Sequence, residues 1–234
     1  THMHPDHIGL SKWLCDGLEK NLWKAEFWTS QAEFFTSRYY SSIGKTNNIM
    51  GKEEFSSLTL DFFLNHGCDL SLEEARIIDR SEFYSKMVPD IPSNYVRIIE
   101  NQNLLIGGQI WKTILCNGHS PEHISLYNEN KELLISGDMI LPKITSHVGV
   151  FPDEPRANPL RFFLDGLQKF KSLPEKTLVL PSHGSPFGGS STGGIMDRIS
   201  QLEQHHFQRM SEIQHHCYEE KTAYELLPQI FPKK

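Results

Sequence analysis

The hydrophobic and polar positions predict that the chain begins with a mostly helical part and continues as a β-rich part. Residues 10–94 form the helical part. Within it, the amphipathic stretch EEFSSLTLDFFLNHG predicts a helix that ends at Gly67, because glycine is the preferred residue just after a helix. Two serine–glutamate pairs have the spacing of a capping box, which is typical of helix starts: Ser30 with Glu33, and Ser71 with Glu74.

The pattern changes at about residue 95. From there, short runs rich in β-branched and aromatic residues are separated by Gly and Asn turns, which predicts consecutive, mainly antiparallel strands. The predicted strands are YVRIIE, NLLIGG, QIWKTILC, HISLYN and ELLISGD. A helix over about 158–172, a short strand in TLVLPSHG and a loop over 186–194 follow. Helical spacing then returns and predicts a long helix through Ile195, Ile199, Leu202, Phe207, Met210 and Ile213.

The composition is that of a globular protein with an acidic balance. The chain has 234 residues, of which 38% are hydrophobic and 22% charged, and its formal net charge is -6. This length is enough for one domain with an appendage. The acidic balance disfavours a nucleic-acid partner without excluding a local basic patch, because contact with phosphates needs basic surface.

The four cysteines are far apart and form no CxxC pair. We therefore expect free thiols in a reducing compartment, and a cytoplasmic location. No apolar run approaches the roughly 18 residues of a membrane-spanning helix, so no membrane partner is expected. The number of subunits is not indicated by the sequence.

The stretch THMHPDHIG at the start of the chain concentrates three histidines and an aspartate within six residues. Imidazole and carboxylate groups suit zinc, iron or manganese, and the set contains no soft thiolate. Four such groups cannot all reach one ion without strain. A pair of ions removes the strain, with His2 and His4 on one ion and Asp6 and His7 on the other.

Three further candidate ligands each follow a predicted strand. They are His119 in CNGHSPEH, Asp138 in ISGDMIL and His183 in LPSHGSPF. Taken alone, each is more often a structural or turn residue than a ligand. Their joint occurrence downstream of the opening cluster favours one shared metal site.

These motifs resemble the metallo-β-lactamase superfamily, whose signature is T-H-x-H-x-D-H-x-G. The block GHSPEHISLYNENKELLISGDMILP resembles glyoxalase II and related hydrolases. The segments ANPLRFFLDGLQKF, LVLPSHGSPF and RISQLEQHH resemble thioesterase-like and lactamase-β-2-like hydrolases. The resemblance implies an α+β fold, the αββα sandwich, present here in part, with a helical insertion and a C-terminal helical appendage.

The resemblance also implies the roles of the seven residues. The first metal would be held by His2, His4 and His119, the second by Asp6, His7 and His183, and Asp138 would bridge both. Two divalent ions are expected, zinc first, with iron or manganese as alternatives. His123 departs from the family pattern, and we expect it to orient a ligand by a hydrogen bond.

The function that follows is hydrolysis by a binuclear metal site. A hydroxide that bridges the two ions would attack an ester or thioester, and Asp6 is the candidate catalytic residue because it can orient the attacking water. Two alternatives remain open. One is a metal-dependent ribonuclease of the lactamase-β-2-like type, and the other is an inactive metal-binding fragment.

The domain organisation expected from the resemblance is a metallo-β-lactamase-like domain over 1–190 and a C-terminal helical extension over 191–234. The extension corresponds to the start of a winged-helix-like region. Residues 10–94 would be an insertion that forms a lid, and its removal should leave the metal content intact. Its aromatic residues line a substrate pocket or form the insertion's own core: Trp23, Phe27, Tyr39, Tyr40 and Tyr84. The first strands of the sandwich are missing, so we expect roughly 60 to 90 further residues before Thr1.

Overall fold

The computed structural model describes residues 1–17, 25–45, 49–71, 74, 80–189 and 193–231. The helices are α1 (Pro5–Ile8), α2 (Ser11–Asp16), α3 (Gln31–Lys45), α4 (Ile49–Asn65), α6 (Arg80–Met87), α7 (Pro159–Phe170), α8 (Ile195–His216) and α9 (Ala223–Ile230). The strands are β1 (Trp28–Thr29), β2 (Val96–Arg97), β3 (Asn103–Ile106), β4 (Gln109–Cys116), β5 (His123–Asn128), β6 (Leu133–Gly137), β7 (Leu178–Pro181) and β8 (Phe187–Gly188).

The main sheet has six strands in the order β3-β4-β5-β6-β7-β8. Neighbouring strands are antiparallel except β6 and β7, which are parallel. A parallel pair needs a long crossover, and the connection that contains α7 provides it. A separate parallel ladder joins β1 to β2 and places Trp28 beside Val96. Strand β1 lies in the part of the chain that was predicted as helical, and β2 lies in the predicted strand YVRIIE. Each of the two strands has only two residues.

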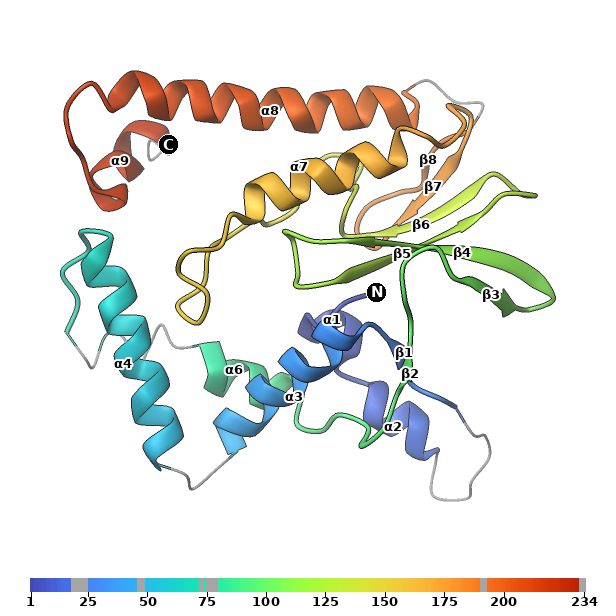
Figure 1. Cartoon of the computed structure of the whole chain (residues 1–234), viewed down its shortest axis with the longest axis horizontal. Coiled ribbons are helices and arrows are strands. Elements are labelled where there is room, and N and C mark those ends of the chain that lie inside the picture. The colour runs from blue at the N-terminus through green and yellow to red at the C-terminus, as the bar shows by residue number, and fades with distance from the viewer. Residues whose placement is uncertain (18–24, 46–48, 72–73, 75–79, 190–192, 232–234) are drawn as a thin grey trace.

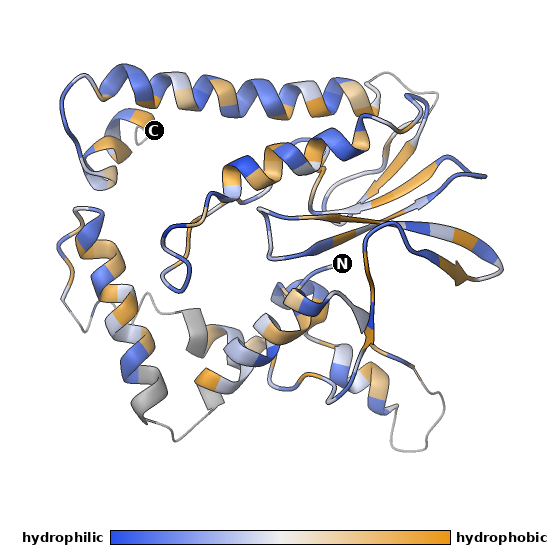
Figure 2. Ribbon diagram, in the orientation of Figure 1, coloured by the Kyte–Doolittle hydropathy of each residue, from blue (hydrophilic) through white to orange (hydrophobic). Residues whose placement is uncertain are grey.

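Helices α7 and α8 cover one side of the main sheet (Figure 1). Phe163 and Phe170 of α7 and Ile199 of α8 are fully buried in one cluster with Leu134 of β6. Burial of each such side chain stabilises the fold by about 1.5–3 kcal/mol. Figure 2 shows apolar and polar residues alternating along both helices, as expected for helices with one buried side.

Helices α1 and α3 lie on the other side of the main sheet (Figure 1). Their core contains Met3 of the opening motif together with Ile8, Phe34, Tyr84 and Val88. The opening motif is therefore packed into the helical part of the chain and does not stand apart from it.

The strands and the long helices agree with the sequence prediction. Strands β3 to β7 and helices α7 and α8 lie where the pattern placed them. Helix α4 ends as predicted: Gly67 has a φ of 85°, its N–H donates to the Leu64 carbonyl, and the N–H of Cys68 donates to the Phe63 carbonyl. These two bonds are those of a Schellman motif.

One of the two predicted capping boxes is confirmed and the other is wrong. The Ser71 hydroxyl accepts from the Glu74 N–H at 3.2 Å, and the Glu74 carboxylate accepts from the Ser71 N–H at 2.8 Å. The Glu33 carboxylate, by contrast, is buried and accepts hydrogen bonds from distant segments. The first turn of α3 is capped from outside, because the Glu122 carboxylate accepts from the Ala32 N–H at 3.1 Å.

The fold is α+β, as expected, and it corresponds to part of an αββα sandwich with additional helices. Most of 10–94 that the structure describes is helical. The predicted boundary near residue 190 falls before α8, and the first half of α8 packs into the main core through Ile195, Ile199 and Leu202. Among the described residues, no helix has the length and apolar character needed to cross a membrane.

Candidate metal centre

Several strand ends meet at one edge of the main sheet. Strand β4 ends at Cys116, which lies opposite His123 at the start of β5. Strand β6 runs antiparallel to β5, so it ends at the same edge, where Gly137 lies beside Pro181 at the end of β7. The sheet topology therefore makes neighbours of three predicted ligands that follow these ends: His119, Asp138 and His183.

The opening turn is attached to the same edge. The Thr1 carbonyl accepts a hydrogen bond from the Ile124 N–H of β5 at 2.9 Å. Helix α1 begins immediately afterwards with Pro5 in its first turn, a position where the missing N–H of proline costs nothing. Its single turn carries Asp6 and His7.

Two glycines allow the ligand loops their conformation. Gly118, just before His119, has a φ of 105°, and Gly137, just before Asp138, has a φ of 55°. A Cβ atom at Gly118 would collide with the backbone of α7, and one at Gly137 would collide with the His123 ring. Only glycine fits both the backbone angle and the space at these positions.

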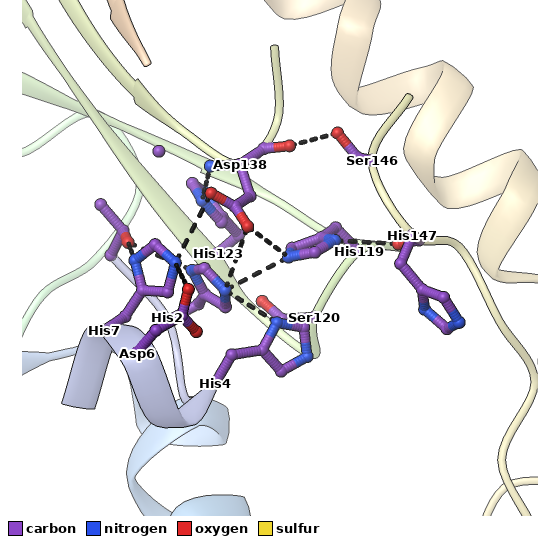
Figure 3. A network of polar contacts seen from close by, with 12 residues as sticks. His2, His4, Asp6, His7, His119, Ser120, His123, Asp138, Ser146 and His147 are labelled. Carbon is purple, nitrogen blue, oxygen red and sulfur yellow. Dashed lines mark hydrogen bonds and ion pairs between the residues drawn. The ribbon is translucent and has the colours of Figure 1, made fainter. Parts of the chain in front are cut away.

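The predicted ligands form two adjoining clusters, drawn in part in Figure 3. In the first cluster, His2 Nε2 lies 2.9 Å from His4 Nδ1 and 3.2 Å from His119 Nε2. The Asp138 carboxylate completes this group, with Oδ2 at 3.4 Å from His119 Nε2. Three of these four residues are buried and His4 is half-buried.

The hydrogen bond on the outer side of the His119 ring assigns its ring proton. His119 Nδ1 donates to the His147 carbonyl at 2.8 Å. With the proton on Nδ1, the inner Nε2 of His119 presents a lone pair to the cluster. The Thr1 hydroxyl, which can donate or accept, lies 3.1 Å from His2 Nδ1. Nitrogens bound to one tetrahedral zinc ion lie about 3.3 Å apart, given Zn–N distances of about 2.0–2.1 Å, so the spacing of the cluster fits a shared cation.

The second cluster consists of Asp6, His7 and His183. Asp6 Oδ2 lies 3.1 Å from His183 Nε2 and 3.4 Å from His7 Nε2. Asp138 adjoins this cluster too, with Oδ2 at 3.6 Å from His183 Nε2 and Oδ1 at 3.5 Å from His7 Nε2. Within the described part of the chain, His7 Nε2 and Asp138 Oδ1 are buried atoms without a hydrogen-bond partner. A second cation between them would satisfy both atoms.

The surroundings favour the protonation states that bind metal. Burial, with the nearby imidazole of His123, lowers the pKa of His2, and burial lowers the pKa of His4 to about 4. Both rings are therefore neutral at pH 7. Burial raises the pKa of Asp138, but the adjacent imidazoles of His119 and His7 outweigh it and hold the pKa below its usual range. The site thus offers neutral imidazoles and an anionic carboxylate, the states that ligate divalent ions.

His123, expected as an orienting residue, lies directly behind the first cluster. It is fully buried, and its Nε2 accepts from the backbone N–H of Asp138 at 3.1 Å. Its ring stacks on the ring of His2, with centroids 5.0 Å apart. The sequence did not predict the contacts of Glu33. Its carboxylate accepts hydrogen bonds from the N–H of Met3 in the opening motif and from the N–H of Glu122 in the loop after His119.

All seven predicted ligands are brought together, so the donor set is five imidazoles and two carboxylates. The cysteine next to the site, Cys116, is buried in the core of the main sheet and forms no part of either cluster. Imidazole and carboxylate donors without thiolate fit zinc, iron or manganese.

Residues 1–183 match the family model of the metallo-beta-lactamase superfamily. The chain belongs to this superfamily. A beta-lactamase domain protein from Burkholderia ambifaria has a similar solved structure, with a TM-score of 0.80 and 35% sequence identity, over 100% of this chain and 61% of that one.

Two curated proteins are similar to this chain in sequence. "Beta-lactamase-like protein 2 homolog" of Caenorhabditis elegans is 30% identical over 46% of this chain and 32% of its own length. "Probable metallo-hydrolase YqjP" of Bacillus subtilis (strain 168) is 24% identical over 52% of this chain and 38% of its own length. The match thus spans about a third of each curated relative. Membership of the superfamily is thus shown, while the glyoxalase II-like branch stays a prediction.

Proposed function

We propose that the protein is a binuclear metal-dependent hydrolase that cleaves an ester or thioester. His2, His4 and His119 would hold one ion and Asp6, His7 and His183 the other, with Asp138 shared between them. The observation that carries this proposal is the position of Asp138, whose carboxylate lies within 3.4–3.6 Å of ring nitrogens from both clusters. Zinc is the proposed metal, because the three imidazoles of the first set and the two imidazoles and carboxylate of the second set both suit it.

Two bound divalent ions supply Lewis acidity and lower the pKa of water toward neutrality. The protein's part is to hold the ligands and to open the site on one side. The first cluster is largely buried, whereas the side chains of Asp6 and His183 are 56% and 47% exposed. Substrate therefore approaches from the side of the second cluster. Asp6 is the carboxylate on that side, and we assign it the orientation of the attacking water and the transfer of its proton.

The substrate class rests on the resemblance to glyoxalase II and thioesterase-like hydrolases. The net charge of -6 disfavours RNA as the substrate, because an acidic surface repels a long polyanion. Among the aromatic residues of the helical part, Tyr84 and the partly buried Phe27 and Tyr40 belong to its core, while Tyr39 is exposed. Trp23 lies outside the described residues.

A substrate panel on protein of defined metal content tests this function. Metal-free protein would be reloaded with zinc, iron(II) or manganese, and assayed with p-nitrophenyl acetate, S-lactoylglutathione, an acyl-CoA and single-stranded RNA. We expect two ions per chain and hydrolysis of an ester or thioester. His4→Ala should abolish the activity, and His215→Ala, which changes a histidine at the far end of α8, should retain it.

Each other outcome contradicts the proposal in a different way. RNA cleavage without ester or thioester hydrolysis, lost in His4→Ala, would identify a ribonuclease. Two bound ions with no activity on any member of the panel would identify an inactive metal-binding protein. A single ion per chain would contradict the binuclear site itself.

A further inference from the structure

The peptide groups of Met3 are held from both sides by the helical part of the chain. Met3 lies between His2 and His4 in the opening motif. Its N–H donates to Glu33 Oε2 at 2.7 Å, and its carbonyl accepts from the Tyr84 hydroxyl at 2.7 Å. The two bonds fix both ends of the residue that separates the two histidines, and so they fix the direction in which each histidine leaves the backbone.

The same glutamate also holds the loop that carries His119. Glu33 Oε1 accepts from the Ser120 hydroxyl at 2.5 Å and from the Glu122 N–H at 2.7 Å. The Glu33 carboxylate therefore joins the opening motif, which carries His2 and His4, to the loop that carries His119. These two segments and α3 are far apart in the sequence.

The contact between α3 and the His119 loop is reinforced by reciprocal bonds. The Ser30 hydroxyl donates to the Glu122 carbonyl at 2.8 Å, and the Glu122 carboxylate accepts from the Ala32 N–H. The first turn of α3 and the segment after His119 are thus locked in register, with Glu33 at the centre of the contact.

The chemistry of this position requires a carboxylate. Glu33 is fully buried, and its partners are two backbone N–H groups and a hydroxyl, all of which donate to it. Burial raises the pKa of Glu33, while the three hydrogen bonds favour the charged form. A buried carboxylate is costly unless it is fully hydrogen-bonded, and the three donors supply these bonds to Glu33.

We propose that Glu33 is a positioning residue for metal binding, which sets His2, His4 and His119 in their binding geometry before the ion arrives. This inference rests on the binuclear site proposed above. Preset ligands bind an ion without paying to order two loops, and outer residues that orient ligands commonly contribute about 10–100-fold in metal affinity. Glu33 differs from the usual outer partner because it orients the backbone of the ligand loops and touches none of the rings.

The inference changes the role of residues 10–94. As a lid, this segment would be removable without loss of metal. Since Glu33 and Tyr84 both lie in it and both hold Met3, its removal is expected to release the opening motif and to weaken the first metal site.

The experiment measures zinc binding by metal-free protein in competition with a chromophoric chelator. It is carried out in a His183→Ala background, so that the first cluster is observed alone. Glu33→Gln keeps the shape of the side chain but turns an NH₂ group toward one of three donors. We expect it to remain folded, as judged by circular dichroism, and to bind zinc about 10–100-fold more weakly than its parent.

The matched control is Tyr40→Phe, which removes the hydrogen bond from the same helix to Asp153 at 2.7 Å and keeps the ring that packs in the core with Met3 and Tyr84. It should leave zinc affinity unchanged. In the background that keeps His183, Glu33→Gln should weaken one of the two zinc-binding steps and spare the other, because the hydrogen bonds of Glu33 go to Met3, Ser120 and Glu122, which flank ligands of the first cluster. A merely structural role would lower the unfolding temperature of the metal-free protein and leave zinc affinity as it was.

Two further substitutions decide the matter if Glu33→Gln does not fold. Tyr84→Phe and Ser120→Ala each remove one bond of the arrangement, and each should weaken zinc binding in the first cluster. Unchanged affinity in both, or in a folded Glu33→Gln protein, would overturn the inference while leaving the proposed function intact. Failure of the parent chain to bind two zinc ions would instead contradict the proposed function.

Discussion

Replacement of Asp138 by asparagine should weaken the binding of both metal ions, whereas the same replacement at Asp6 should weaken only one. The Asp138 carboxylate lies near His119 of the first cluster and near His183 of the second. Asp6 contacts ring nitrogens of the second cluster alone, those of His7 and His183. The two substitutions change the same atoms, so the difference between them reports the position of each carboxylate.

Burial sets the expected magnitudes. The Asp138 side chain is 9% exposed and that of Asp6 is 56% exposed. Two unit charges about 4 Å apart attract by about 1 kcal/mol in water and by about 4 kcal/mol at the effective dielectric of a protein site. For each unit of charge on the ion, loss of the carboxylate charge should therefore weaken zinc binding about fivefold in Asp6→Asn and about a thousandfold in Asp138→Asn.

The assay is a zinc titration of metal-free protein with a chromophoric chelator as competitor, which resolves the two binding steps. Asp6→Asn should retain one step at the parent affinity, and Asp138→Asn should lose affinity in both. Parent-like affinity in Asp138→Asn, or loss of both steps in Asp6→Asn, would refute the assignment of Asp138 as the shared ligand.

Three other predictions concern stability. Gly118→Ala should lower the free energy of unfolding by about 1–3 kcal/mol or more, because Gly118 has a φ of 105° and a Cβ atom would strike α7; an unchanged urea midpoint would contradict this. Removal of metal by a chelator should lower the unfolding temperature by about 5–10 °C relative to protein with zinc at about 100 times its Kd, and identical temperatures would argue against bound metal. Glu203→Gln should flatten the loss of stability between about pH 5 and pH 3 in urea unfolding. Partial burial raises the pKa of Glu203, but hydrogen bonds with Lys171 and Gln168 outweigh it and hold the pKa below 4.5, so the stabilisation is present above that pH and is lost as the pH falls; identical pH profiles would count against these bonds.

Much of the fold was predictable because its main elements have strong local patterns. Strands β3 to β6 are short apolar runs between Gly and Asn turns, and α7 and α8 have clear helical spacing. Strand β2 lies within the predicted strand YVRIIE, but its partner β1 was missed in the part predicted as helical, since a two-residue strand leaves no periodicity to detect. The seven candidate ligands were found from their residue types, spacing and family resemblance, and the structure gathers them in two adjoining clusters. Their binding of metal remains a prediction.

Glu33 shows where the sequence misled. Its spacing from Ser30 is that of a capping box, a local pattern, but its partners lie about 30 and 90 residues away. Local spacing holds no information on such partners. Ser30, Glu33, Ser37 and Ser41 recur at helical spacing, a polar stripe that by itself predicts a solvated helix face. The structure shows instead that all four residues are buried.

The most direct test of the central claim is the anomalous scattering of zinc in crystals of the metal-loaded protein. Two peaks are predicted, one enclosed by the rings of His2, His4 and His119 and one between Asp6, His7 and His183, with the Asp138 carboxylate next to both. A single peak, or peaks away from these side chains, would contradict a binuclear centre built from the opening motif and the three strand ends.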